Sequence, residues 1–103
     1  MFITTVMVPL EGHKFALGEV VLTQGVHQLV LQGLVNPAEL LRRHGLGDWG
    51  DLCDSDKRLN DSALRPGDEG RVHSSYEMDG VSTVWVITEW DRSVTTLLLP
   101  SEH

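Results

Sequence analysis

The chain is poor in cysteine and in basic residues. Its 103 residues include one cysteine, Cys53, which excludes an internal disulfide and a multi-cysteine zinc site. A lone cysteine is also typical of the reducing cytosol. Eight Lys and Arg residues face fifteen Asp and Glu residues, for a formal net charge of -7. Because such a surface repels phosphate backbones and anionic lipid, we expect no direct nucleic-acid binding.

Long hydrophobic runs are also missing. The N-terminal segment MFITTVMVPL is apolar, but no basic region precedes it. Pro9 and Glu11 end it far short of the roughly 18 residues that span a bilayer. We therefore predict no membrane contact and a cytoplasmic protein. The length suits a single domain, residues 1–103, with one core.

The motifs of common enzyme classes are absent too. The sequence has no Gly-rich phosphate loop, no nucleophile elbow and no paired-histidine helix. No cofactor is therefore expected. The lack of these motifs favours a non-enzymatic protein, although it leaves the question of catalysis open.

The first part of the chain predicts short strands and a helix. Residues 2–8 alternate as in a strand, and residues 19–22 form a second short strand. Thr23 can cap a helix over residues 24–32, which the glycine at position 33 would stop.

A second helix is predicted more strongly, from the sequence Asn36-Pro37-Ala38-Glu39. Asn36 can accept from first-turn amides, and the missing N–H of Pro37 costs nothing there. Glu39 can reach back to the cap. This helix should run to His44 and end at Gly45, burying Leu40 and Leu41.

The stretch HGLGDWGDLCDSD, residues 44–56, joins this helix to a third one. Asp54 or Ser55 is a natural cap, and the third helix should bury a stripe of Leu59, Ala63 and Leu64. Trp49 is expected to anchor the connection to the core. On this interpretation the stretch is a structural elbow.

Metal binding by the same stretch is not expected. A calcium loop starting at Asp54 would need glycine at its sixth position and glutamate at its twelfth, where the sequence has Leu59 and Arg65. A zinc set of His44, Asp48 and Cys53 has no recognised spacing.

After the third helix, the pattern becomes alternating. Residues 71–78, 81–90 and 93–99 predict three strands, and Asp79-Gly80 predicts a tight hairpin between the first two. Pairing through that turn assigns Val72, Tyr76, Trp85 and Ile87 to one face, and His73, Ser75, Val84 and Val86 to the other. The third strand should add Val94, Thr96 and Leu98 to the first face, and Thr95, Leu97 and Leu99 to the second.

Together these elements predict an α+β fold, in which short N-terminal strands and about three helices pack on a C-terminal three-stranded antiparallel meander. Both faces of the meander carry apolar residues, more than three short helices would cover. Since monomers rarely expose a large apolar patch, we expect a homodimer or a higher homo-oligomer.

Three stretches, HGLGDWGDL, DKRLNDSAL and WVITEWDRSVTTLLLPSE, resemble a family of small uncharacterised proteins encoded on bacterial plasmids and other mobile elements. The similarity covers about residues 18–102 and departs at Trp90 and at residues 1–16, which by comparison with this family look like an N-terminal strand extension. The resemblance implies a mobile-element origin, such as a gene cassette, and brings no catalytic chemistry with it.

Polar residues crowd the turn after the second strand of the meander. Glu89, Asp91 and Arg92 could recognise a protein partner or a small anion, together with Asp48, Trp49 and Asp51 from the elbow. Ordinary turn chemistry explains the same residues: Asp91 can bond to backbone amides, and Arg92 can pair with a neighbouring acid.

Three further interpretations remain open. Arg71, His73 and Glu77 on one strand could serve a small metal-free ribonuclease toxin, although the acidic surroundings oppose this. Residues 48–79 hold nine acidic and four basic residues, which would also suit an acidic inhibitor that mimics nucleic acid. A small-ligand binding module is the third. The favoured prediction is a non-enzymatic accessory protein of a mobile element that acts through protein–protein association.

Overall fold

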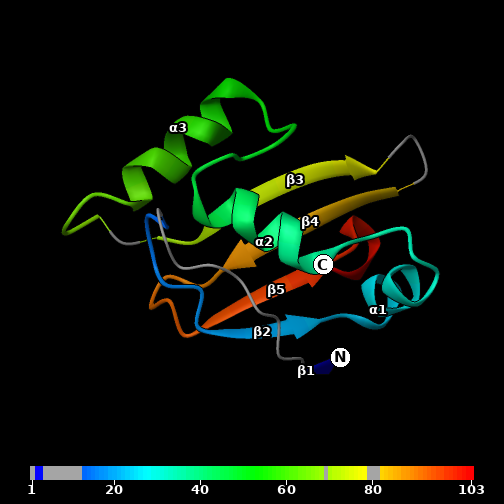
Figure 1. Cartoon of the computed structure of the whole chain (residues 1–103). Coiled ribbons are helices and arrows are strands. Elements are labelled where there is room, and N and C mark those ends of the chain that lie inside the picture. Colours follow the sequence, from blue (N-terminus) through cyan, green and yellow to red (C-terminus); the bar gives the residue numbers. More distant parts are fainter. Residues whose placement is uncertain (1, 4–12, 69, 79–81) are drawn as a thin grey trace.

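Within the described residues, the fold has three α-helices and a mixed sheet, whose arrangement Figure 1 shows. This computed structural model describes residues 2–3, 13–68, 70–78 and 82–103. Its strands are β1 (Phe2–Ile3), β2 (Glu19–Leu22), β3 (Val72–Met78), β4 (Ser82–Thr88) and β5 (Val94–Leu98). Its helices are α1 (Gln24–Leu31), α2 (Pro37–Gly45) and α3 (Asp54–Ala63), followed near the C-terminus by a 3-10 turn, Pro100–Glu102. The predicted α+β class is confirmed.

The sheet has the strand order β1-β2-β5-β4-β3. Strands β3, β4 and β5 form the predicted antiparallel meander. Strand β2 adds to it in parallel with β5, and β1 pairs antiparallel with β2, so the sheet is mixed. The remainder of the predicted first strand, residues 4–8, lies outside the described residues.

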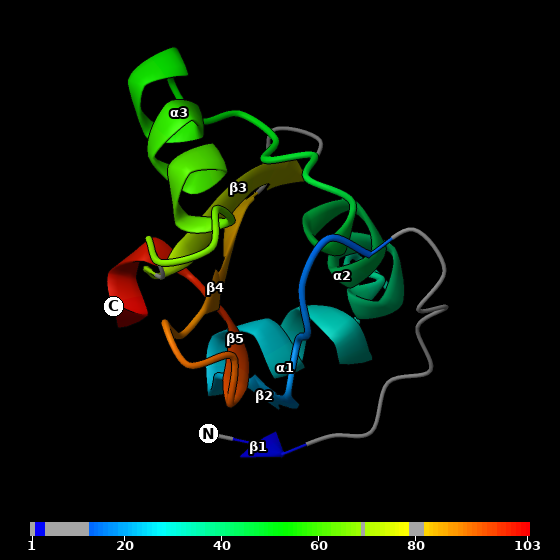
Figure 2. The same ribbon diagram turned by 90° about the vertical axis from the view of Figure 1, so that its left-hand side faces the viewer.

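Two layers of helical structure flank the sheet (Figure 2). Helices α1 and α2 lie on one side, which we call the inner face, and α3 and the C-terminal turn lie toward the other side, the outer face. The main core forms between the inner face and the first two helices, with Val26 from α1 and Leu41 from α2 completely buried. The inner face contributes Val72, Ser74, Tyr76, Val84, Val86, Thr88, Thr95 and Leu97.

The assignment of β3 and β4 residues to faces was wrong by one position. Met78 pairs with Ser82, so three residues separate the strands instead of the two that were predicted. A one-residue slip turns every side chain of one strand to the opposite face. Tyr76 therefore shares the inner face with Val84, while Trp85 lies on the outer face with His73. The residues of the predicted Asp79-Gly80 turn lie outside the described part of the chain. The predicted sharing of faces between β4 and β5, with Leu98 beside Trp85, is confirmed.

Helix α1 obtains its N-terminal cap from a distant residue. Thr23 occupies the cap position, but its hydroxyl donates to the carboxylate of Glu102 instead of capping its own helix. The same carboxylate accepts from the backbone N–H of Gly25, at 2.9 Å, and from that of Leu99, at 3.0 Å. Glu102 thus ties the C-terminal turn to the positive end of α1.

Helix α2 begins and ends as predicted. The side chain of Asn36 accepts from the N–H of Glu39, and Leu40 and Leu41 are buried. Glu39 does not reach back to the cap, however. Its carboxylate accepts two hydrogen bonds from Arg42, at 2.6 and 2.9 Å, because the flexible cation one turn later offers a charged partner.

Helix α3 differs from prediction at its cap and in its stripe. Its cap residue is Cys53, with Asp54 as the first helical residue and no side-chain cap. Leu59 is 67% exposed, and Asn60 takes the buried position instead. The amide of Asn60 bonds to both the backbone N–H and the C=O of His73, at 3.0 and 2.6 Å. A buried strand edge needs such partners, so the edge of β3 selects the polar side chain.

The elbow GDWGD completes the same edge of β3. The N–H of Ser75 donates to the C=O of Trp49, and the N–H of Asp51 donates to the C=O of Ser75. A Cβ on Gly50 would lie 2.0 Å from that Ser75 oxygen, and the φ of Gly50 is +73°. Only glycine fits this approach. The elbow is therefore held against the sheet by its own backbone.

Candidate functional site

The predicted binding residues of the elbow mainly serve the fold. Asp48 accepts from Arg43, at 2.7 Å, and from the N–H of Gly50, at 3.1 Å. The Arg43 hydrogen bond lowers the pKa of the Asp48 carboxyl. Trp49 is 4% exposed and donates its indole N–H to Asp61, which confirms its anchoring role. Asp51 accepts from the backbone N–H of Glu77, at 2.9 Å.

The turn between β4 and β5 is equally occupied. Asp91 accepts from both the N–H and the hydroxyl of Ser93, which lowers the pKa of its carboxyl. Arg92 has a φ of +60° and donates to three backbone carbonyls: those of Gly70 at 2.6 Å, Ala63 at 2.9 Å and Glu89 at 3.1 Å. Its guanidinium thus joins the turn to the loop after α3.

The elbow and the turn meet around Phe15. The Phe15 ring stacks on Trp49, with centroids 6.2 Å apart, and the guanidinium of Arg92 lies 5.5 Å from the centre of the same ring. Trp49 and Arg92 are therefore brought together, but through contacts that pack the molecule. Glu89 differs from the others: its carboxylate lies 3.5 Å from Arg71 Nε.

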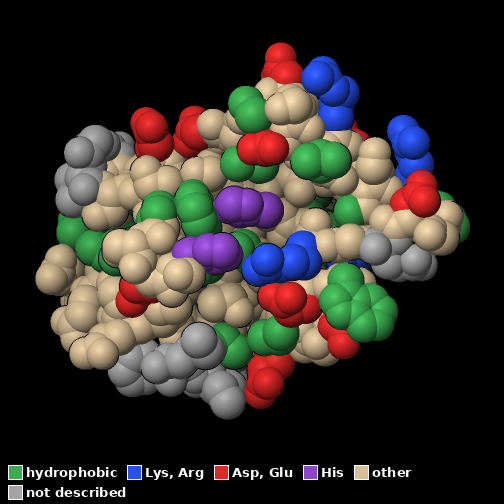
Figure 3. All heavy atoms as spheres, turned by 180° about the vertical axis from the view of Figure 1, so that it is seen from behind, with side chains coloured by type: hydrophobic (Ala, Val, Ile, Leu, Met, Phe, Trp, Pro, Cys, Tyr) green, Lys and Arg blue, Asp and Glu red, His purple; other side chains and the backbone are tan. Residues whose placement is uncertain are grey.

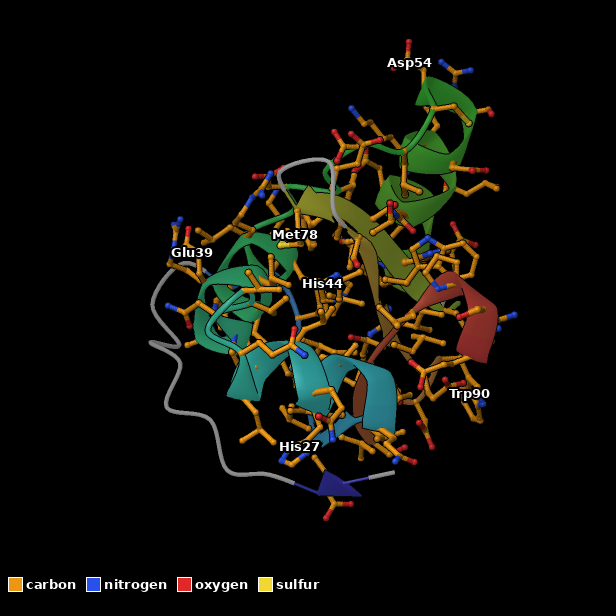
Figure 4. The ribbon with its side chains drawn as sticks, turned by 90° about the vertical axis from the view of Figure 1, so that its right-hand side faces the viewer. His27, Glu39, His44, Asp54, Met78 and Trp90 are labelled. Atoms are coloured by element: carbon orange, nitrogen blue, oxygen red, sulfur yellow. The ribbon has the colours of Figure 1, made fainter. Side chains whose placement is uncertain are left out.

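A buried polar network lies between α2 and the inner face. Figure 4 shows His44 pointing from α2 toward the sheet. Its Nδ1 lies 2.6 Å from the Ser74 hydroxyl, and its Nε2 lies 2.9 Å from the Thr88 hydroxyl. Thr88 continues the chain to Thr95, whose hydroxyl donates to the C=O of Leu17. The available signal was that Ser74, Thr88 and Thr95 each lie two positions from an apolar residue of the inner face. The predicted register had placed Ser74 and Thr88 on opposite faces.

Burial decides the charge of His44. The ring is completely buried, and desolvation lowers its pKa from 6.5 to about 3. A neutral imidazole has one donor and one acceptor, which match the two hydroxyls. Because each polar atom of the ring has a partner and none faces solvent, this network serves the core.

The outer face holds a groove of about 300 Å³. It lies over β3 and β4 beside the C-terminal segment and is lined by Arg71, His73, Trp85, Ile87 and His103. Figure 3 shows this face, with two histidine side chains next to each other and a cationic side chain beside them. A second hollow of about 190 Å³ adjoins it, sharing Arg71 and His73 and bounded by α3 residues including Leu59.

Trp85 forms the centre of this groove. The predicted register put Trp85 on the same face as Tyr76, but the observed register places it on the outer face, where the half-buried indole lines the groove. The His73 ring meets it edge-to-face with centroids 4.8 Å apart, and the His103 ring does so from 5.5 Å. The groove therefore has an aromatic floor flanked by two imidazoles.

The polar groups of the groove are incompletely paired. His73 Nε2 is buried and has no hydrogen-bond partner among the described residues. Burial, with a smaller contribution from Arg71, lowers the pKa of His73. The Arg71 side chain is 51% exposed, and its Glu89 contact is the one ion pair or hydrogen bond found for it in the described part of the chain. Most N–H donors of Arg71 therefore have no partner among the described residues, whereas the guanidinium of Arg92 donates to three backbone carbonyls.

The residues of the ribonuclease hypothesis are only partly assembled. Arg71 and His73 share the groove, but Glu77 does not line it, and four residues along a strand separate it from His73 by roughly 13 Å. General acid–base cleavage needs its groups within hydrogen-bond reach of one substrate. Within the described ranges, no cluster of three or more His, Cys, Asp or Glu side chains could hold a metal ion. No helix there is both long and apolar enough to cross a membrane.

No family model matches this chain, and no curated protein and no solved structure matches it either. The resemblance to mobile-element proteins therefore stays a prediction.

Proposed function

We propose that this protein acts without catalysis, by associating with other protein chains through its outer face, and that its first partner is a second copy of itself. The mobile-element origin implied by the sequence would make it a cytoplasmic accessory protein of such an element. The observation that carries the proposal is the incomplete cover of the outer face, where the half-buried Trp85 lines an open groove and the exposed Leu59 lines the adjoining hollow.

Two large apolar residues are exposed on elements next to the groove. Leu59 on α3 is 67% exposed and lines the smaller hollow, and Trp90 is 62% exposed beside Glu89, the partner of Arg71. Figure 4 places Trp90 on the same side of the molecule as α3 and the C-terminal turn. Tryptophan and arginine surrounded by apolar contacts are typical of the energetic centre of a protein interface.

The geometry favours contact through the face over pairing at the β3 edge. Asn60 and the Trp49–Asp51 segment already bond to the outward N–H and C=O groups of His73 and Ser75. A second copy can therefore not extend the sheet there without displacing them. Contact of two outer faces about a two-fold axis instead buries Trp85, Leu59 and Trp90 in both chains.

Light scattering over a concentration series tests the proposal. We expect the mass of two chains at micromolar concentration, and a shift toward one chain in the double variant Leu59→Asp, Trp90→Asp. Leu31→Asp is the matched control, because Leu31 is as exposed as Leu59 but lies at the end of α1. Salt should strengthen the dimer, since each chain carries a net charge of -7.

A mass of one chain at all concentrations would contradict self-association. Equal weakening by Leu31→Asp would move the interface to the α1 side of the molecule. Circular dichroism of each variant checks that the fold is kept.

A further inference from the structure

We infer that the groove over β3 and β4 is a binding site for a small aromatic carboxylate, with the ring of the ligand against Trp85 and its carboxylate on Arg71. The site is formed within one chain, and because the self-association proposed above would cover Trp85, the ligand and a second copy would compete for this face. The site would add ligand recognition to the same face.

The size and the floor of the groove determine the size and shape of the ligand. A volume of about 300 Å³ is at the lower end of the range for small-molecule pockets and suits a one- or two-ring molecule. The floor consists of the Trp85 indole and of Ile87, which is 4% exposed. A planar ring can pack on the indole, and the imidazoles of His73 and His103 flank the same surface.

The hydrogen-bond donors of the groove determine which charge the ligand should carry. Arg71 offers a planar fork that matches a carboxylate, and its contact with Glu89 Oε1 is a single long one, at 3.5 Å. His73 contributes its ring to the lining of the groove, edge-to-face with Trp85, and Arg71 is the cation that faces the ligand there.

Two acids select a monoanion over a dianion. Glu89 lies beside Arg71, and Asp56 lines the adjoining hollow. A carboxylate places one negative charge near them, whereas a phosphate monoester places nearly two. Repulsion from the two acids therefore favours the carboxylate.

Heteronuclear NMR titration of the full chain provides the test, with the Trp85 indole N–H as reporter. The probes are 2-naphthoate, its neutral analogue 2-naphthamide, acetate and 2-naphthyl phosphate. We expect 2-naphthoate to shift the Trp85 signal and to bind at least about tenfold more tightly than each of the other three. Arg71→Gln should weaken 2-naphthoate about tenfold, while Arg65→Gln, an exposed arginine outside the groove lining, should leave it unchanged.

Equal affinities for 2-naphthoate and 2-naphthamide would overturn the anion site, and so would equal effects of the two arginine variants. Tighter binding of 2-naphthyl phosphate would overturn the choice of carboxylate. Repeating the titration on Trp90→Asp at concentrations where it is a single chain separates the two proposals, because a dimer through the outer face would cover Trp85. Binding of 2-naphthoate to the single chain supports the ligand site whether or not the wild type self-associates, and a folded single chain that binds none rejects the ligand site alone.

Discussion

The two faces of the sheet satisfy their polar groups in different ways. On the inner face, His44 reaches two hydroxyls and is fully buried. On the outer face, His73 is half-buried, and one of its ring nitrogens has no partner among the described residues. Complete pairing with complete burial is what a core requires, and incomplete pairing beside an open groove is what a binding surface offers. The comparison directs the search for function to the outer face.

The largest expected effect comes from removing the inner histidine. His44→Ala leaves a cavity and two buried hydroxyls without their partner, so we expect a loss of about 3–5 kcal/mol in the free energy of unfolding. His73→Ala should cost about 1 kcal/mol or less, because the ring is half-buried and one of its nitrogens is unpaired. Urea denaturation measures both. Equal losses would remove the distinction between the faces.

The two arginines repeat the comparison with a smaller effect. Arg92 donates to three backbone carbonyls, and Arg92→Ala should cost about 2–3 kcal/mol. Arg71 makes one exposed ion pair, so Arg71→Ala should cost about 0.5 kcal/mol or less. Thermal unfolding monitored by circular dichroism would show this order. If Arg71→Ala proved the more harmful, the groove would be part of the stabilising structure.

Acidification should act through the inner face. The pKa of His44 is about 3 in the folded chain and near 6.5 when unfolded, so the unfolded state binds more protons between these values. His44 therefore contributes fully to stability above pH 6.5, and the contribution is lost as the pH falls toward 3. The free energy of unfolding should drop by about 1 kcal/mol per pH unit between pH 6 and 5, where ordinary carboxyl groups are still ionised in both states.

A matched variant assigns that loss to His44. In His44→Gln the decline between pH 6 and 5 should be clearly shallower than in the wild type, leaving the part due to His73, whose pKa is also lowered. An unchanged slope in His44→Gln would show that another group takes up the protons.

The smallest effect is expected at the start of α3. Asp54 is the first helical residue and not the cap, so Asp54→Ala should cost no more than about 0.5 kcal/mol, the size of a favourable charge near the helix N-terminus. Chemical denaturation can resolve this value. A loss above 1 kcal/mol would restore Asp54 as a capping residue.

Local signals predicted the helices and strands because they depend on neighbours in the sequence. Asn36 and Pro37 predicted the start of α2, and alternation predicted the meander. The candidate site was less accessible. Of the predicted binding residues, Asp48, Asp91 and Arg92 hold turns or loops, and their role in recognition stays a prediction. Aspartate and arginine are common both in turns and in binding sites, so the residue types suit either role. Only the contacts in the folded chain show that these residues hold turns or loops.

By itself, the sequence determined the class of the fold, the order of its main elements and the burial of anchors such as Trp49, since hydrophobic periodicity and turn residues act over short distances. The tertiary structure decided which face each residue of β3 and β4 occupies. One residue more in the connection between these strands moved Tyr76 into the core and Trp85 into the groove. The tertiary structure also placed Asn60 at the β3 edge and Glu102 at the start of α1, because buried backbone groups take partners from wherever the chain brings them.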